Sequence, residues 1–136
     1  MRTSLTILAS LSLTLLFLSI GLVASKTAEA QGAHSFNDTC HEPFLDGSTL
    51  VAMCQRVDGS FRRSEILLRG IENVDGRLAR TSDDRPANFQ GSCNRQHVSS
   101  GIIVAYCRRL DGNYQRTATT IDGIENIDGH LRYTDR

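Results

Sequence analysis

The chain has 136 residues, of which 40% are hydrophobic and 22% charged, and its 15 basic and 15 acidic side chains balance to a formal net charge of zero. A near-neutral chain gives no electrostatic reason to expect nucleic acid or an anionic membrane as a partner. The length allows one small domain with a modest core once the N-terminal segment is set aside.

Residues 1–30 are expected to be a signal peptide. Arg2 precedes an apolar stretch at 5–24, and residues 28–30 (AEA) have the small-x-small pattern of a cleavage site. The apolar stretch is long enough to span a bilayer, so an uncleaved membrane anchor is the alternative. Cleavage is favoured because the cleavage pattern and a polar segment follow directly. The mature domain, residues 31–136, is then expected to be secreted, extracellular or periplasmic, with no membrane contact.

The mature part is a tandem duplication without gaps. A shift of 53 residues superimposes GIENVDG at 70–76 on GIENIDG at 123–129, and it also superimposes both cysteine pairs. We assign repeat one to 35–86 and repeat two to 88–136. Two repeats are too few for a solenoid, which indicates a closed globule.

The four cysteines of an exported chain favour two disulfides over a metal site. Of the three possible pairings, only Cys40–Cys54 with Cys93–Cys107 is local and equivalent in both repeats. A four-cysteine zinc site is the alternative, and it is disfavoured because no C-x-x-C pair is present. No motif for another metal or a cofactor is present, so none is expected.

Both repeats are expected to be all-β, because β-branched and aromatic runs alternate with Asp-Gly and Gly turn signals. The run at 43–48 and its counterpart at 97–101, inside the disulfide loops, are expected to be irregular or single-turn helical. The polar segment 81–87 is expected to link the repeats. Strands are predicted at 48–57, 60–68, 69–76 and 77–80, and in repeat two at 101–110, 113–121, 122–129 and 130–134.

The duplicated peptide is the first candidate for function. Glu72 and Asp75 form a carboxylate pair that could act as acid and base in a hydrolase. Carboxylates beside a turn glycine usually serve the turn, however, and Asn73 and Asp75 with Gly76 are expected to cap backbone N–H groups there. Two similar sites suit binding better than catalysis, which needs one asymmetric cleft. The chain is therefore expected not to be an enzyme, and its polar turns suit a neutral polyol.

Several duplicated segments resemble the cyanovirin-N homology family. They are SFNDTC at 35–40, STLVAMCQRVDGSF at 48–61 and IENVDGRL at 71–78, then NFQGSC at 88–93, GIIVAYCRRLDGNY at 101–114 and IENIDGHLRY at 124–133. The resemblance implies an all-β fold of two pseudo-symmetric, strand-exchanged halves with one disulfide per repeat. It also implies a lectin that binds mannose-rich oligosaccharides through one or two sites, as a monomer or a domain-swapped dimer.

The resemblance places the two sugar sites at opposite ends of the molecule. Site one comprises Ser35, Asp38, Thr39, Gln55, Arg56, Val57, Asn126, Ile127 and Asp128. Site two comprises Glu72, Asn73, Asp75, Asn88, Gly91, Ser92, Arg108, Arg109 and Leu110.

Three residues depart from the family pattern. Val57 and Leu110 stand where the founding member has polar contacts, and Gly91 stands where it has an acidic side chain. These changes leave open an alternative function, in which the chain keeps the fold as a structural or protein-interaction module without sugar binding. Residues 37–39 also form an N-glycosylation sequon at the edge of site one.

Overall fold

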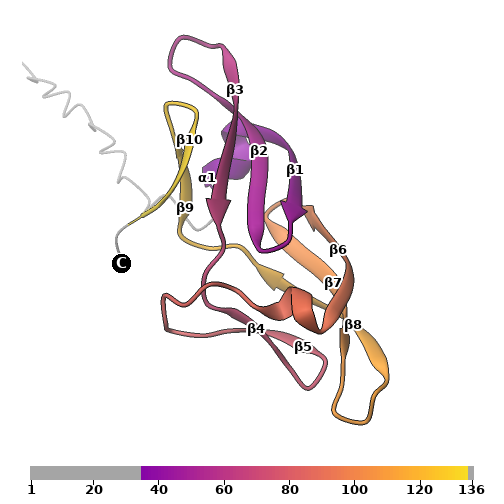
Figure 1. Ribbon diagram of the computed structural model, residues 1–136. Helices are drawn as coiled ribbons and strands as arrows, with labels where there is room; N and C mark the ends of the chain where they lie inside the picture. Colours follow the sequence, from indigo (N-terminus) through magenta and orange to yellow (C-terminus); the bar gives the residue numbers. More distant parts are fainter. Residues whose placement is uncertain (1–34, 135–136) are drawn as a thin grey trace, which may run out of the picture.

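The structure is a computed structural model that describes residues 35–134 (Figure 1). The predicted signal peptide and its cleavage site lie outside the described residues. No helix within 35–134 is long and apolar enough to cross a membrane.

The described chain forms two three-stranded antiparallel sheets and two hairpins (Figure 1). The sheets have the orders β1-β2-β3 and β6-β7-β8, and the hairpins are β4–β5 and β9–β10. The elements are α1 (Ser35–Thr39), β1 (Cys40–Asp46), β2 (Thr49–Gln55), β3 (Phe61–Leu67), β4 (Ile71–Val74), β5 (Arg77–Arg80), η1 (Phe89–Gly91), β6 (Cys93–Ser99), β7 (Ile102–Arg108), β8 (Tyr114–Thr120), β9 (Ile124–Ile127) and β10 (His130–Tyr133).

Each hairpin packs on the sheet of the other repeat. β5 lies against β8, where the Leu78 N–H donates to Thr117 Oγ1 at 3.0 Å, and β10 lies against β3, where the Leu131 N–H donates to Ser64 Oγ at 2.9 Å. The two contacts occupy equivalent positions in the duplication. The expected all-β fold with strand-exchanged halves is therefore confirmed.

A single core joins the two halves. Its largest members come in equivalent pairs: Phe36 with Phe89, and Leu50 with Ile103, all fully buried. Phe36 lies in α1 and Phe89 in η1, so each short helix contributes one phenylalanine to the core. Full burial of a large apolar side chain stabilises the fold by about 1.5–3 kcal/mol, so these pairs hold the two repeats together.

Both predicted disulfides are present. Cys40–Cys54 joins β1 to β2 and Cys93–Cys107 joins β6 to β7, each with the two Cα atoms 4.0 Å apart. Because all four cysteines of the chain are bonded, the four-cysteine zinc site is excluded.

The prediction for 43–48 and 97–101 is wrong, because the first segment belongs mainly to strand β1 and the second to strand β6. Both strands are sheet edges with a bulge, shown by register shifts between His41 and Phe44 and between Asn94 and His97. An edge strand with one solvent face and a bulge does not show the regular alternation that marks a half-buried strand. Proline has no backbone N–H to donate to a neighbouring strand, so it is tolerated at position 43, within the bulge of an edge strand.

Candidate functional site

The Asp-Gly pair of each duplicated peptide forms a two-residue hairpin turn. Asp75 and Gly76 have φ angles of 48° and 82°, and Asp128 and Gly129 have φ angles of 49° and 81°. Two successive positive φ angles define the type I′ turn, which matches the twist of the strands it joins. The Gly76 N–H donates to Asn73 Oδ1 at 2.8 Å, so the predicted Asn cap of the turn is confirmed.

The same peptide also binds the other repeat. Asn73 Nδ2 donates to Ser92 Oγ at 2.8 Å and to the Arg108 carbonyl at 2.9 Å. Asp75 Oδ1 accepts the Leu110 N–H at 2.9 Å. Asp75 therefore caps a backbone N–H, as expected, but the donor lies 35 residues away in repeat two and not in its own turn. We call Asn73 and Asp75 the first clasp.

The second clasp, Asn126 and Asp128, repeats this geometry at the other end of the molecule. Asn126 Nδ2 donates to Thr39 Oγ1 at 2.9 Å and to the Gln55 carbonyl at 2.8 Å. Asp128 Oδ1 accepts the Val57 N–H at 3.0 Å. The motif is duplicated because each copy holds the turn of one repeat onto the strand ends of the other.

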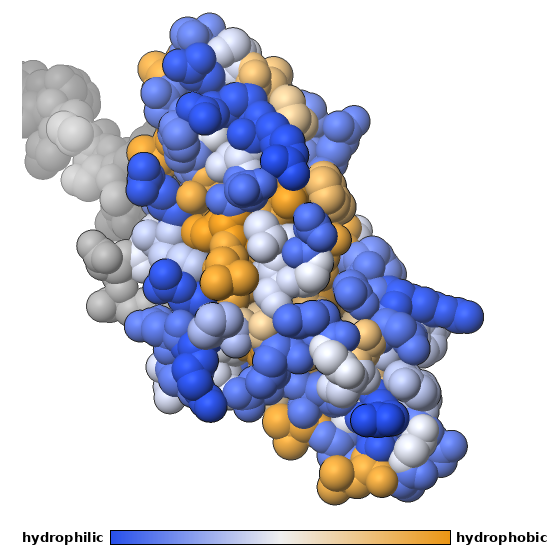
Figure 2. Space-filling model, in the orientation of Figure 1, coloured by the Kyte–Doolittle hydropathy of each residue, from blue (hydrophilic) through white to orange (hydrophobic). Residues whose placement is uncertain are grey.

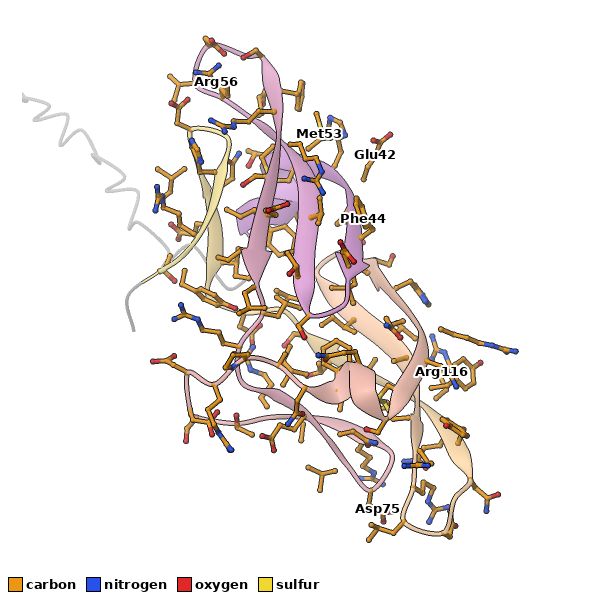
Figure 3. All side chains as sticks on the ribbon, viewed as in Figure 1. Glu42, Phe44, Met53, Arg56, Asp75 and Arg116 are labelled. Atoms are coloured by element: carbon orange, nitrogen blue, oxygen red, sulfur yellow. A yellow bond between two sulfur atoms is a disulfide. The ribbon has the colours of Figure 1, made fainter. Side chains whose placement is uncertain are left out.

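A cavity of about 400 Å³ opens beside the first clasp, between the β4–β5 turn and the β7–β8 turn. Figure 3 shows Asp75 at this end of the molecule and Arg56 at the opposite end. Six of the nine residues predicted for site two line the cavity, together with one that was not predicted. The lining residues are Asn73, Asp75, Ser92, Arg108, Arg109, Leu110 and Gly112.

The polar groups of the cavity differ in how much hydrogen-bonding capacity remains. Asn73 donates both amide hydrogens to protein atoms, so it can offer a ligand only a lone pair of Oδ1. Asp75 uses Oδ1, which leaves Oδ2 as an acceptor, and Ser92 accepts from Asn73 and keeps its hydroxyl hydrogen to donate. Arg108 and Arg109 add exposed guanidinium donors. This set of acceptors and donors suits vicinal hydroxyl groups.

Close packing fixes the position of Arg109. A Cβ atom placed on Gly76 would lie 2.5 Å from Arg109 Cγ, so the arginine stem runs directly over the turn glycine. Its Nη1 atom is 3.5 Å from Asp111 Oδ2. The backbone N–H of Asn113 lowers the pKa of Asp111, and the Ser60 hydroxyl lowers the pKa of Asp58 in the equivalent turn. Both carboxylates are thus kept ionised beside the arginines that follow each second cysteine.

Three residues predicted for site two do not line the cavity. The Glu72 carboxylate pairs with Arg85 at 3.3 Å, and Asn88 is exposed beside η1, where its N–H donates to the Ile71 carbonyl. Gly91 faces open space. The lining residue that the sequence did not suggest is Gly112, whose Asp-Gly turn had been interpreted only as a hairpin signal.

Most of the predicted site one gathers around the second clasp. Thr39, Gln55 and Val57 are its hydrogen-bond partners, and a Cβ atom on Gly129 would lie 2.7 Å from Arg56 Cγ. The packing of Arg109 on its turn glycine is therefore repeated here. The remaining members are Asp38 and Ile127, which are exposed, and Ser35, whose side chain is not among those described.

Each end of the molecule also exposes an apolar pair. Val57 and Leu110 are 91% and 92% exposed, and the neighbouring turn residues Ile127 and Val74 are about half exposed. Figure 2 shows separate hydrophobic patches at the end formed by the β4–β5 and β7–β8 turns. Exposed apolar groups next to polar ones suit the C–H faces of a sugar ring.

The sequon of residues 37–39 lies partly inside α1. The Nδ2 atom of Asn37 is buried and has no hydrogen-bond partner among the described residues. A glycan on this nitrogen would require the Asn37 side chain to adopt another conformation in which Nδ2 is exposed.

Known proteins share this architecture. A solved complex of microvirin with mannobiose is 28% identical, with a TM-score of 0.57, over 74% of this chain and 98% of that chain. The CVNH protein of T. borchii is 25% identical, with a TM-score of 0.61, over 74% and 99% of the two chains. The MoCVNH-LysM module of the rice blast fungus Magnaporthe oryzae is 21% identical, with a TM-score of 0.63, over 75% and 98%, which shows the shared fold. The family model of the CVNH domain matches residues 36–132, so the chain belongs to the cyanovirin-N homology (CVNH) family.

Proposed function

We propose that the protein is a secreted carbohydrate-binding protein, a lectin, that recognises mannose-rich oligosaccharides at the cavity beside the first clasp. The observation that carries the proposal is the cavity itself, where Asp75 Oδ2, the Ser92 hydroxyl and the Arg109 guanidinium keep capacity for hydroxyl groups next to the exposed side chain of Leu110. The 28% identity to microvirin, which was solved with mannobiose, supports mannose as the sugar. The second clasp, with the same geometry, is proposed as a second site.

An NMR titration with α-(1,2)-linked mannobiose tests the proposal. We expect shifts of the Asp75, Ser92 and Leu110 amides as sugar is added. The variant Arg109→Gln should weaken binding at this end, because a charge-assisted hydrogen bond contributes roughly 1.5–3 kcal/mol. The matched control is Arg56→Gln, which removes the equivalent side chain at the other end and should leave these three shifts unchanged.

The competing function is a structural or protein-interaction module without sugar binding. The observation that favours it is the near-complete exposure of Val57 and Leu110, which offer a protein partner an apolar contact at each end. A glycan array decides between the two. If the protein binds no mannose-rich or other glycan at millimolar glycan concentrations, the lectin proposal fails and the structural or protein-interaction module is the remaining function.

We also propose that the protein is exported from the cytoplasm. Two disulfides support an oxidising compartment, in agreement with the signal peptide expected at 1–30. The N-terminal residue of the protein recovered from culture medium or periplasm tests this: Gln31 agrees with cleavage, whereas a chain that keeps Met1 and stays with the membrane would show that the segment is an anchor.

A further inference from the structure

The two sheets share one backbone plan but carry opposite charge. Segment 40–67, which forms the first sheet, holds three arginines and four acidic residues, whereas segment 93–120 holds four arginines and one aspartate. Both sheets occupy equivalent places in the fold. The basic character of the second sheet is therefore not required for folding, and its arginines are available for binding.

The outer face of the second sheet contains a groove of about 230 Å³. It is lined by Asn94, Arg95, Tyr106 and Tyr114, and the two tyrosines are 36% and 51% exposed. Arg116 lies directly opposite Tyr106 in the β7–β8 register and therefore on the same face. None of these five residues lines the cavity beside the first clasp, so the groove is a separate site.

The strand bulge directs an arginine at this groove. Arg95 has a φ of 51° at the irregularity in β6, and its guanidinium carbon lies 5.8 Å from the centroid of the Tyr106 ring. At this distance the arginine is held over the aromatic face. Bulges commonly redirect a side chain toward a functional site in this way.

The arginines of this face have no acidic partner within residues 35–134. Arg95 and Arg116 form none of the ion pairs of the described chain, while Arg63, the equivalent of Arg116 in the first sheet, pairs with Glu65 at 2.9 Å. Glu42 occupies the position equivalent to Arg95. Figure 3 shows Glu42 and Arg116 projecting outward from their sheets. At this register the first sheet thus pairs its arginine with a glutamate, whereas the second sheet leaves two guanidinium groups for a ligand.

We propose that this groove is a further carbohydrate site, distinct from both clasps and specific for an anionic sugar that carries a carboxylate or a sulfate. Tyr114 offers its ring to the sugar and Tyr106 holds Arg95 in place, while Arg95 and Arg116 pair with the anionic group, for which a guanidinium fork is well matched. A nucleic acid is disfavoured by the zero net charge of the chain and by the disulfides, which belong to an oxidising compartment. Anion recognition rests on the groove alone, and only the choice of a sugar as its carrier rests on the proposed function.

Isothermal titration of the purified protein with four probes tests the inference. The probes are a tetragalacturonate, a heparin tetrasaccharide, neutral mannotetraose and a single-stranded oligothymidylate. We expect at least one of the two anionic sugars to bind with an affinity that falls as salt is added. Binding of the tetragalacturonate shows that a carboxylate is sufficient, whereas binding of heparin alone, which carries carboxylates as well as sulfates, shows that a sulfate is required. Binding to the oligothymidylate that equals or exceeds binding to both anionic sugars would overturn the proposal.

The matched variants come from the duplication. Arg116→Gln should reduce affinity for the anionic sugar about tenfold, the loss of one charge-assisted pair, whereas Arg63→Gln, at the same register in the first sheet, should change it less than about twofold. Tyr106→Ala should also weaken binding, and its counterpart Met53→Ala should not. Equal losses in Arg116→Gln and Arg63→Gln, or no binding of either anionic sugar, would refute the site. Mannobiose shifts at Asp75 are scored separately, so failure of either proposal is recognised by itself.

Discussion

Replacing Asn73 by alanine removes every hydrogen bond of the first clasp that the asparagine makes. Three are lost: one from the Gly76 N–H, one to Ser92 Oγ and one to the Arg108 carbonyl, at 2.8, 2.8 and 2.9 Å. A hydrogen bond contributes about 1 kcal/mol net, and water can reach some of the freed groups, so we expect a loss of about 2–3 kcal/mol. For a domain of this size that loss lowers Tm by roughly 10–20 °C.

Thermal unfolding followed by circular dichroism measures the effect, with three controls. Asn126→Ala breaks the second clasp and should cost the same, because its three hydrogen bonds are equivalent. The double variant should lose the sum of the two, since the clasps lie at opposite ends of the molecule and share no partner. Asn113→Ala, at an exposed turn residue that belongs to neither clasp, should change stability by less than about 0.5 kcal/mol. A Tm for Asn73→Ala within about 3 °C of wild type, by the scaling of Tm with stability, would refute the clasp as a structural device.

Further perturbations address the turn, the disulfide and pH. Gly76→Ala combines a φ of 82° with a contact of 2.5 Å to Arg109 Cγ, so it should lower Tm strongly, whereas Gly91→Ala, in open space, should leave Tm unchanged in the same melting experiment. Removing the second disulfide in a Cys93→Ala/Cys107→Ala variant opens a loop of about 15 residues and should cost about 3 kcal/mol in urea unfolding; an unchanged midpoint would contradict its structural role. The backbone N–H of Asn113 holds the folded pKa of Asp111 below the ordinary aspartate value of 3.8, so the contribution of Asp111 to stability is fully present above pH 3.8 and is lost as pH falls through the folded pKa. Asp111→Asn should thus be less stable than wild type at pH 7, and the difference should shrink as pH falls below 3.8 and through the folded pKa; a difference independent of pH would exclude titration as the cause.

The duplication made much of the fold predictable. The turn of residues 75–76 could be located because Asp-Gly between two β-branched runs is a strong local signal for a hairpin. The pairing of the disulfides followed from their equivalence in the two repeats, and the structure confirms it. Both features involve residues close together in the chain, so short stretches of sequence are enough to predict them.

The features that sequence could not supply depend on distant contacts. Strand β1 contains a proline and a bulge, and its pairing with β2 across the disulfide overrides the weak local preference. The hydrogen-bond partner of Asp75 is the backbone N–H of a residue in repeat two, and no local sequence pattern predicts so distant a partner. The exchange of hairpins was expected only because of the family resemblance. The family resemblance also predicts Glu72 at the sugar site, whereas in the structure its carboxylate pairs with Arg85.

The clasps also limit where sugar specificity can reside. Asn73 and Asn126 commit both amide hydrogens to the fold, and the equivalent aspartates commit one oxygen each, so the duplicated motif is nearly the same at the two ends. A ligand that distinguishes the ends must do so through residues outside the motif. The exposed side chains that follow the second cysteine of each repeat meet this condition, because Leu110 at one end and Val57 at the other contribute only a backbone N–H to the clasp. Exchanging these two side chains should therefore alter which end binds a given sugar while leaving Tm unchanged.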